Sequence, residues 1–329
     1  MKRPEPVVVE NLVKKYRKNS VLAVNNLSFS VGEGEIYGLL GPNGAGKSTS
    51  IGMLTTMVVP SSGSVFIGGV DAVSHPALAR KGIGVVPQHN NLDRAISIRH
   101  NLLFHARYHR IPKIERNSRT NILLKEFGLE ERSKDRPQQF SGGQAQRVMI
   151  ARALMHEPKV LFLDEPSTGL DPAARLFIWD RIRDLKKRGV TIVLTTHDMT
   201  EAAALSDRVG IVHSGRLIAE GTPDELIRRF LNKTIVDITG IILSSNSSNM
   251  AQVSEKLSTM NGIMGIENLR VDETRETFAL KLSVERTATQ LVSNITSVLE
   301  EHGALLQDFH MAKPSLEDVF IHLTGRTLQ

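Results

Sequence analysis

The sequence predicts an α/β protein built on a parallel sheet, followed by a small α+β domain. Short apolar runs, each as long as a buried strand, alternate with helical patterns over the first two thirds of the chain. A glycine-rich run joins one of these strands to a helix. After about residue 234 the pattern changes to β-α-β-β-α-β, which is typical of a ferredoxin-like domain. The length of 329 residues agrees with about two domains.

The composition sets limits on the class of protein. Hydrophobic residues make up 40% of the chain, which is enough for real cores, and the net charge is only +6. There is no cysteine, so disulfides and cysteine-ligated zinc are excluded. No apolar run approaches the ~18 residues that span a bilayer. We therefore expect the chain to be soluble by itself and to need another chain for any membrane span.

The glycine-rich run fits the pattern G-x-x-x-x-G-K-[ST]. Residues 36–40 before it form an apolar strand, and residues 47–58 after it are predicted to be a helix with Ile51, Leu54 and Val58 on one face. In such a loop, backbone N–H groups surround a polyphosphate, the lysine reaches its terminal phosphates and the serine hydroxyl binds Mg²⁺. We expect a nucleoside triphosphate site formed by Gly41, Pro42, Asn43, Gly44, Ala45, Gly46, Lys47, Ser48 and Thr49.

Polar residues follow two further predicted strands. The apolar run 160–163 ends in Asp164 and Glu165, and the run 191–196 ends at His197. If these strands lie parallel to residues 36–40, all three side chains reach the same edge of the sheet, where ligands bind in such folds. There Asp164 would hold Mg²⁺ through water, and Glu165 would polarise the water that attacks the γ-phosphate. His197 would contact the γ-phosphate and hold that water.

A second anion site is predicted at the start of another helix. Ser141, Gly142, Gly143 and Gln144 follow Phe140 and precede a helical pattern from residue 145 to about 156. With two phosphate-binding elements in one chain, the sequence resembles the ATP-binding cassette (ABC) ATPases over roughly residues 5–230. Phe140 stands where leucine is commoner in that family.

The resemblance extends to seven elements in the order of the family. Tyr16 matches the aromatic residue that stacks on adenine, and residues 41–49 match the Walker A loop. Gln88 matches the Q-loop glutamine, which contacts Mg²⁺ and faces the permease. The other four matches are the signature (Ser141, Gly143 and Gln144), Walker B with the catalytic glutamate (Asp164 and Glu165), the D-loop (residues 167–171) and the switch histidine (His197).

The resemblance implies ATP and Mg²⁺ as ligands and a dimer as the working form. In the family, the signature of one subunit closes over the ATP that the Walker A loop of its partner holds. It implies that Lys47, Gln88, Glu165 and His197 serve hydrolysis, and that Ser48, Gln88 and Asp164 hold Mg²⁺. Two identical subunits are possible, because every catalytic residue is present, but pairing with a different ATPase subunit remains open.

Short matches narrow the kind of transporter. The ending 313–320 resembles the tail of ATPase subunits of the ABC-2 export type, including the daunorubicin-resistance group, and residues 85–110 resemble nodulation-factor exporters. They imply export through a separate ABC-2 type permease and a place on the cytoplasmic face of the cell membrane. The membrane chain selects the cargo, so drug, lipid, glycan and peptide remain open.

We expect an ATP-binding domain over residues 5–232 and an accessory domain over 234–329, regulatory or dimer-stabilising. The first domain contains a helical subdomain at about 90–155, with apolar stripes that include Leu102, Ile122 and Leu123, and its cleft near 88–108 is where relatives receive the permease. The second opens with a strand at 235–243 and ends in a helix capped by Ser315. Residues 181–188 form a basic helix end in which Asp184 and Arg188 are expected to pair.

Two other functions agree with parts of the sequence. One is a soluble ABC ATPase that acts on nucleic acid or ribosomes. Its known relatives carry two cassettes in one chain or split the cassette with a long coiled coil, whereas this cassette is single and continuous. The basic patch at 181–188 also fits a solvated helix end better than a nucleic-acid footprint, so no nucleic-acid partner is expected. The other is a non-hydrolysing binding module, against which Glu165 and His197 both argue.

Overall fold

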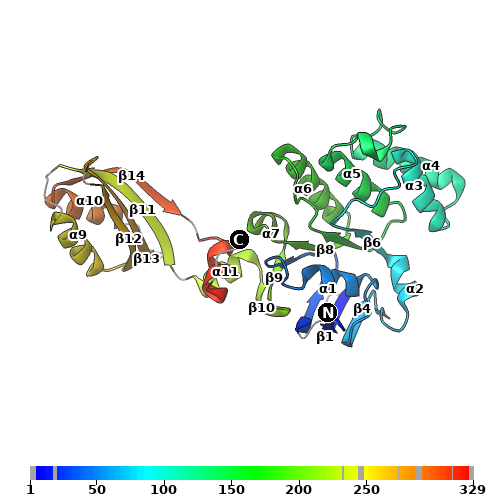
Figure 1. The fold of residues 1–329 in the computed structure, drawn as a ribbon, viewed down its shortest axis with the longest axis horizontal. Coiled ribbons are helices and arrows are strands. Elements are labelled where there is room, and N and C mark those ends of the chain that lie inside the picture. Colours follow the sequence, from blue (N-terminus) through cyan, green and yellow to red (C-terminus); the bar gives the residue numbers. More distant parts are fainter. Residues whose placement is uncertain are drawn as a thin grey trace. The chain divides into compact units, whose positions relative to one another are not determined.

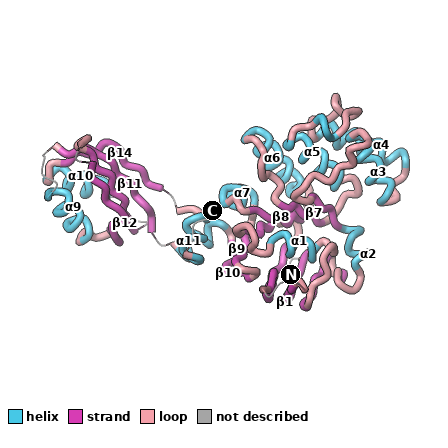
Figure 2. Tube along the Cα trace, in the orientation of Figure 1, coloured by secondary structure: helices cyan, strands magenta, loops and turns pink. Residues whose placement is uncertain are grey.

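The computed structural model describes residues 5–17, 21–231, 233–243, 248–272, 274–285, 291–312 and 314–325. The chain divides into two compact units, the first over residues 1–223 with 328–329 and the second over 224–327. Figures 1 and 2 show the elements of both units. Residues 244–247 and 286–290, and Lys313 of the segment 313–320, lie outside the described part.

The strands of the first unit form two sheets. They are β1 (Val7–Lys15), β2 (Leu22–Val31), β3 (Ile36–Leu40), β4 (Ser62–Ile67), β5 (Val70–Asp71), β6 (Ile83–Val86), β7 (Val160–Asp164), β8 (Thr191–Thr196), β9 (Arg208–His213) and β10 (Arg216–Gly221). Its helices are α1 (Lys47–Leu54), α2 (Pro76–Ala79), α3 (Ile98–Tyr108), α4 (Lys113–Glu126), α5 (Gly142–Ala153), α6 (Pro172–Lys187) and α7 (Met199–Leu205), with 3₁₀ turns at Arg80–Gly82 and Pro137–Gln139.

The larger sheet has the order β10-β9-β3-β8-β7-β6. Strands β9, β3, β8, β7 and β6 are parallel, as predicted for the three strands that carry the polar edge, and β10 returns antiparallel from the hairpin turn at residues 214–215. Both faces are covered: Leu161 and Leu163 of β7 pack with the helical layer, whereas Val160 and Phe162 pack with α1 and the smaller sheet. Burial on both faces explains the continuous apolar run.

Residues 5–85 contribute strands to two different sheets. Apart from β3 and β6, their strands form a separate antiparallel sheet in the order β2-β1-β4-β5. Alternation explains this arrangement, because Val7, Val9 and Leu12 of β1 are buried while the residues between them are more exposed. One polar face and one buried face are typical of antiparallel strands that cover a core from outside.

Three helix predictions need correction. Helix α1 ends at Leu54 and not near Val58, because Thr56 has a positive φ of 62° that ends the helical path. Helix α5 begins at Gly142, three residues before the predicted start. In the helical subdomain Leu102 and Leu123 are buried as expected, but Ile122 is 59% exposed.

The basic end of α6 is neutralised by acidic neighbours. Arg188 does not pair with Asp184 through its side chain; its Nη2 lies 2.6 Å from Oε1 of Glu126 in α4. Asp184 instead contacts Arg181 at 2.9 Å and Lys187 at 3.1 Å. The patch is therefore a set of ion pairs rather than a free positive surface.

The second unit has the predicted ferredoxin-like topology. Its elements are α8 (Pro223–Phe230, of which residue 223 falls in the first unit), β11 (Lys233–Ile242), α9 (Ser248–Ser258), β12 (Ile263–Asp272), β13 (Thr277–Glu285), α10 (Leu291–Glu301), β14 (Ala304–Ala312) and α11 (Leu316–Thr324). The sheet order is β12-β13-β11-β14, with every neighbour antiparallel. Helices α9 and α10 cover one face (Figure 2) and share its core. Ser315 caps α11 in a reciprocal capping box with Asp318, as predicted.

Within the described residues, we find no helix that combines the length and the apolar character needed to cross a bilayer.

Candidate active site

The glycine-rich loop joins β3 to α1 through backbone that only glycine adopts easily. Gly44 and Gly46 have positive φ values of 80° and 103°. A Cβ on Gly46 would lie 2.3 Å from the carbonyl oxygen of Ala23, so this position also excludes any side chain. The loop therefore holds its N–H groups and the start of α1 in a fixed geometry.

Lys47 lies inside this loop and is only 4% exposed. Its Nζ donates to the carbonyl oxygens of Gly41 at 2.7 Å and Pro42 at 3.1 Å, and it lies 3.6 Å from Oε1 of Glu165. Burial lowers the pKa of Lys47 from its usual value, while the negative charges of Glu165 and Asp164 oppose that shift. The ammonium group is thus placed next to both acids that the sequence singled out.

Ser48 and Asp164 meet at the end of β7. The hydroxyl of Ser48 donates to Oδ1 of Asp164 at 3.3 Å, and the hydroxyl of Thr195 donates to the same oxygen at 2.5 Å. The loop and the central strand therefore bring together two oxygen donors from residues 116 positions apart.

Glu165 is the residue on which the site converges. It has a positive φ of 51°, and its backbone N–H donates to both the hydroxyl and the carbonyl oxygen of Thr195 at 3.1 Å. Its Oε2 accepts from Nε2 of Gln88 at 3.0 Å and from the hydroxyl of Thr168 at 3.2 Å. The left-handed backbone turns the carboxylate out of the strand and into the site, at a conformational cost on the order of 1 kcal/mol or more.

His197 approaches the same carboxylate. Its Nδ1 lies 3.3 Å from Oε2 of Glu165, although the angles do not meet those of a hydrogen bond. Next to it, Asp198 caps α7 by accepting from the N–H groups of Thr200 and Glu201. The structure therefore brings Lys47, Gln88 and His197 around Glu165, as the order of the motifs indicated.

Tyr16 lies at the edge of this site, just after β1. Its hydroxyl lies 3.5 Å from Oγ1 of Thr49, and the side chain is 38% exposed. The ammonium of Lys14 lies 5.2 Å from the centre of its ring. The aromatic ring is thus next to the glycine-rich loop and accessible to a planar ligand.

The Ser141–Gln144 segment forms the first turn of α5. The hydroxyl of Ser141 accepts from the N–H of Gln144 at 3.3 Å, and Oε1 of Gln144 accepts from the N–H of Ser141 at 3.1 Å. The same Oε1 accepts from Arg132 at 2.9 Å, and this guanidinium lies 4.2 Å from the ring centre of Phe140. A Cβ on Gly143 would lie 2.7 Å from that of Ala174, so close packing against α6 requires glycine.

Several residues that support the site were missed by sequence reasoning. Glu201 in α7 is fully buried, and its Oε1 accepts from the hydroxyl of Ser167 at 2.6 Å and from Nε1 of Trp179 at 3.2 Å. Burial raises the pKa of Glu201 above its usual value, against the hydrogen bonds that lower it. This carboxyl connects the D-loop to α6 and α7, and only its place four residues after His197 could have indicated it.

This arrangement defines a P-loop nucleotide-binding fold, and comparisons identify its family. A family model for "ABC transporter" matches residues 24–168. The chain is 41% identical over 307 residues to "Nod factor export ATP-binding protein I" of Rhizobium meliloti, covering 93% of this chain and 84% of that protein. It is 36% identical over 324 residues to "Linearmycin resistance ATP-binding protein LnrL" of Bacillus subtilis (strain 168), covering 97% and 98%.

Comparison with solved structures gives the same family. One described as the ATP-binding subunit of an ABC transporter has a TM-score of 0.63 at 33% identity, over 68% of this chain and 92% of that one. The post-hydrolysis dimer of the ATP-binding cassette MJ0796 with ADP and Pi has a TM-score of 0.61 at 29% identity, over 66% and 98%. The chain belongs to the ABC transporter family, as one of its ATP-binding ATPase subunits.

Proposed function

We propose that this protein hydrolyses ATP to drive export through a separate membrane permease of the ABC-2 type. The observation that carries the proposal is the convergence of Lys47, Gln88 and His197 on the carboxylate of Glu165. A protein that only bound nucleotide would not need this arrangement. The names of the relatives support export, since one serves Nod factor export and another linearmycin resistance.

Nucleotide binding is assigned to the loop and to residues at its edge. Tyr16 stacks on the adenine, and the backbone of residues 43–49 together with Lys47 holds the phosphates. For this, the ammonium of Lys47 exchanges the carbonyl oxygens of Gly41 and Pro42 for phosphate oxygens. Charge-assisted contacts of this type are about twice as strong as neutral hydrogen bonds. The phosphate ligands are Asn43, Gly44, Ala45, Gly46, Lys47, Ser48 and Thr49.

The residues beside the loop fit Mg²⁺. The oxygens of Ser48 and Asp164 lie 3.3 Å apart and would both bind the ion. The side-chain oxygen of Gln88, whose Nε2 donates to Glu165 at 3.0 Å, would supply a third ligand. Oxygen ligands are those that Mg²⁺ prefers, and it is usually held by one or two protein groups with substrate phosphates and water. When bound, Mg²⁺ would neutralise charge that develops on the phosphates.

Glu165 is assigned as the general base. Its carboxylate takes a proton from water as the water oxygen attacks the γ-phosphorus, and the bond to ADP breaks. Lys47 stabilises the charge on the phosphate oxygens, while Gln88 and His197 orient the carboxylate and the water. General-base catalysis of this kind contributes about 10²–10⁴-fold to a rate.

We further propose that two copies of the chain form the working unit. Ser141 and Gln144 hydrogen-bond to each other, and Gln144 also accepts from Arg132, so these contacts all lie within the helical subdomain. Ser141, Gly143 and Gln144 would therefore contact the ATP held by a partner. A neighbouring structure of an ABC cassette is a dimer with ADP and Pi, which supports this arrangement.

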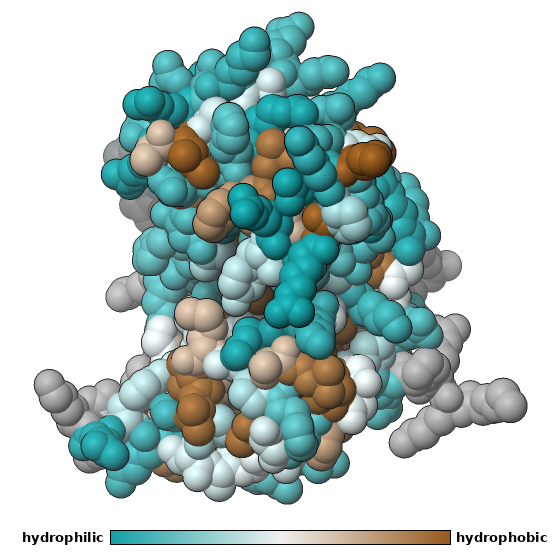
Figure 3. All heavy atoms as spheres, turned by 90° about the vertical axis from the view of Figure 1, so that its right-hand side faces the viewer, coloured by the Kyte–Doolittle hydropathy of each residue, from teal (hydrophilic) through white to brown (hydrophobic). Residues whose placement is uncertain are grey.

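The helical subdomain offers a surface for the permease. On the side of the first unit where α2, α3 and α4 lie, hydrophobic side chains occur in separate groups among hydrophilic ones (Figure 3). In α3, Phe104 is 70% and Tyr108 78% exposed. We assign residues 5–232 to ATP binding and residues 234–329 to a regulatory or dimer-stabilising role. Docking to a permease places the chain on the cytoplasmic face of the membrane, with no nucleic-acid partner.

A pull-down tests this function. A tagged Glu165→Gln chain should bind Mg-ATP without hydrolysing it, and so remain in its closed form. From detergent-solubilised membranes we expect it to retain a protein with about six hydrophobic segments, in the presence of ATP. The matched control is Lys47→Ala, which should not bind ATP and should lose ATP-dependent recovery.

Two results would overturn the proposal. Recovery of ribosomes or DNA without a membrane protein would favour the soluble ATPase that acts on nucleic acid. Wild-type hydrolysis by the Glu165→Gln chain would remove the general base from the assignment.

A further inference from the structure

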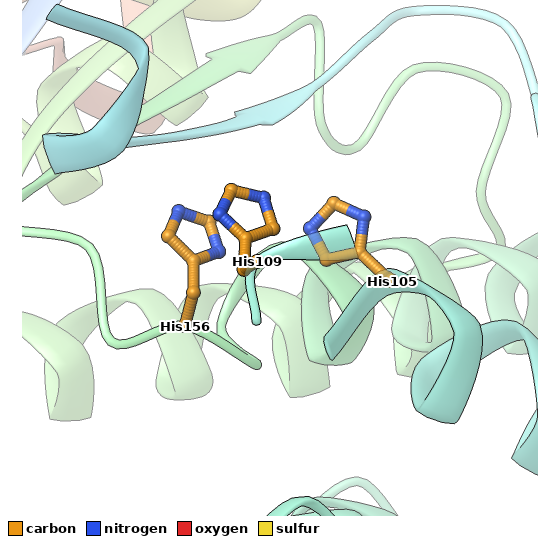
Figure 4. Close-up of side chains that lie close together, drawn as sticks. All are labelled: His105, His109 and His156. Atoms are coloured by element: carbon orange, nitrogen blue, oxygen red, sulfur yellow. The ribbon is translucent and has the colours of Figure 1, made fainter. Parts of the chain in front are cut away.

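Three histidines meet in the helical subdomain, beside the first residue of β6. His105 lies in α3, His109 follows the end of α3, and His156 lies in the turn between α5 and β7. One ring nitrogen from each lies within 4.8 Å of the other two. Figure 4 shows the three imidazoles side by side, with the ring of His109 between the other two. From this juxtaposition we propose a binding site for a first-row transition-metal dication such as Zn²⁺.

The hydrogen bond of His156 determines which of its nitrogens is free. Its Nε2 lies 2.9 Å from the carbonyl oxygen of Ile83. A carbonyl oxygen only accepts, so the proton of the neutral ring is on Nε2 and the lone pair is on Nδ1. That Nδ1 is buried and has no hydrogen-bond partner. Histidines that bind metals commonly donate their other N–H to a carbonyl or carboxylate, which orients the ring.

His105 also has a ring nitrogen that makes no hydrogen bond. Its Nε2 is buried and also lacks a hydrogen-bond partner. A buried polar atom without a partner costs about 1–3 kcal/mol, so two of them in one cluster indicate an absent ligand. Burial lowers the pKa of His105 to about 3 and that of His156 to about 4, with repulsion from His109 adding to both. Neutral rings have the lone pairs that a metal ion needs.

The spacing requires only side-chain movement. In a tetrahedral zinc site the Zn–N distance is about 2.0–2.1 Å, which places ligand nitrogens roughly 3.4 Å apart. The rings of His109 and His156 are stacked with centres 3.8 Å apart and planes 7° from parallel, so His109 must turn out of the stack to share an ion. His109 is the C-cap residue of α3 and is half-buried, which leaves its ring room to rotate.

The chemistry of the ligand set selects the metal class. Imidazole suits zinc, copper, iron and nickel, whereas calcium and magnesium prefer oxygen. The surroundings also carry positive charge, from Arg152 near His105 and Arg119 near His156. The charge of Arg119 is balanced by Glu115 at 2.5 Å and Glu157 at 3.0 Å. Three histidines leave a fourth position for water, as in other three-histidine zinc sites.

Such an ion would connect the end of α3 to the turn before β7. It would fix the position of α3 relative to the core strand whose far end carries Asp164 and Glu165. The site uses none of the nucleotide residues, so its test is independent of the proposed function.

Metal binding to the full chain tests the site directly. Protein freed of metal by a chelator is titrated with Zn²⁺ by calorimetry and with Co²⁺ by visible absorption, without nucleotide. We expect one ion per chain and the absorption bands of tetrahedral Co²⁺. His105→Ala, His109→Ala and His156→Ala should each weaken Zn²⁺ binding at least tenfold and abolish those bands. The matched control, His75→Ala, removes an exposed histidine elsewhere in the first unit and should leave both unchanged.

His109→Ala keeps the test decisive if the buried variants fail to fold, because its ring is half-buried and has no structural hydrogen bond to lose. Folding is checked by ATP binding. No stoichiometric binding by the wild-type chain would overturn the proposal. So would tight binding that persists in all three variants, or binding that His75→Ala weakens as much as His109→Ala.

Discussion

The ion pair between Lys47 and Glu165 can be measured apart from nucleotide binding. Lys47→Ala removes an ammonium group that is 4% exposed and leaves the Glu165 carboxylate buried beside it. At 3.6 Å and an effective dielectric constant of ~20, the Coulomb attraction is about 5 kcal/mol. Breaking a buried pair by removing one partner typically costs about 3–5 kcal/mol. Because Gln88 and Thr168 still donate to Glu165, we expect the lower end, about 3 kcal/mol.

A double-mutant cycle isolates the pair. In a Glu165→Gln background the carboxylate that lies 3.6 Å from the ammonium is absent, so adding Lys47→Ala should cost only about 1 kcal/mol, chiefly from the lost hydrogen bonds to Gly41 and Pro42. The expected coupling energy is therefore about 2 kcal/mol. ATP affinity should show no such coupling. The Lys47→Ala chain and the double mutant should each bind ATP at least tenfold more weakly than the corresponding chain with Lys47, whatever residue occupies position 165.

The assay is urea unfolding of the nucleotide-free chain, followed by tryptophan fluorescence. Trp179 is the single tryptophan and lies buried in α6, so the signal reports on the first unit alone. A coupling energy below about 0.5 kcal/mol would refute the reasoning, since independent sites add within that margin. A Lys47→Ala chain as stable as the wild type would refute it as well.

Three further outcomes are expected. Gly46→Ala should lower the unfolding free energy by about 2–3 kcal/mol and impair ATP binding; Gly44→Ala, where a Cβ meets nothing within 4 Å, should cost only about 1 kcal/mol, and equal effects in urea unfolding would contradict the clash. Burial raises the pKa of Glu201 in the folded protein above the value of about 4.5 that the group has in the unfolded chain. As the pH rises above about 4.5, the unfolded chain therefore loses this proton more readily than the folded protein, and the free energy of unfolding falls. The stability of Glu201→Gln relative to the wild type should increase as pH rises above about 4.5, and a pH-independent difference would exclude this. A chain that ends at residue 232 should keep intrinsic ATP hydrolysis in a phosphate-release assay, and its loss in a folded truncation would place the second unit in catalysis.

The main strands and the site were predictable because local patterns and motif order determine them. The apolar run 160–163 required a strand covered on both faces, and its two acids had to fall at the sheet edge. Helix ends were harder to predict. The end of α1 depends on the positive φ of Thr56, and threonine is not of a type that favours a positive φ. The separate antiparallel sheet depends on pairings between β1 and β4 that are distant in sequence.

Contacts made by tertiary packing could not be predicted at all. The link from Glu201 to Ser167 and Trp179 joins three elements, and each residue by itself resembles an ordinary helix or loop residue. The histidine cluster joins His105 of α3 and its C-cap residue His109 to His156, which follows 47 residues after His109. Arg188 pairs with Glu126 of another helix and not with Asp184, which is nearer in the sequence, because tertiary packing places the Glu126 carboxylate 2.6 Å from the guanidinium.

The reciprocal bonds between Ser141 and Gln144 have a consequence for association. The hydroxyl of Ser141 uses an oxygen lone pair to accept from Gln144, so its own hydrogen is available to donate to a phosphate oxygen without giving up the helix cap. The side-chain rotation that would otherwise be lost on meeting a partner's nucleotide is already lost during folding. Ordering one such side chain at an interface costs about 0.5–1.5 kcal/mol, so in the proposed dimer this entropy is lost on folding and is not lost again on association.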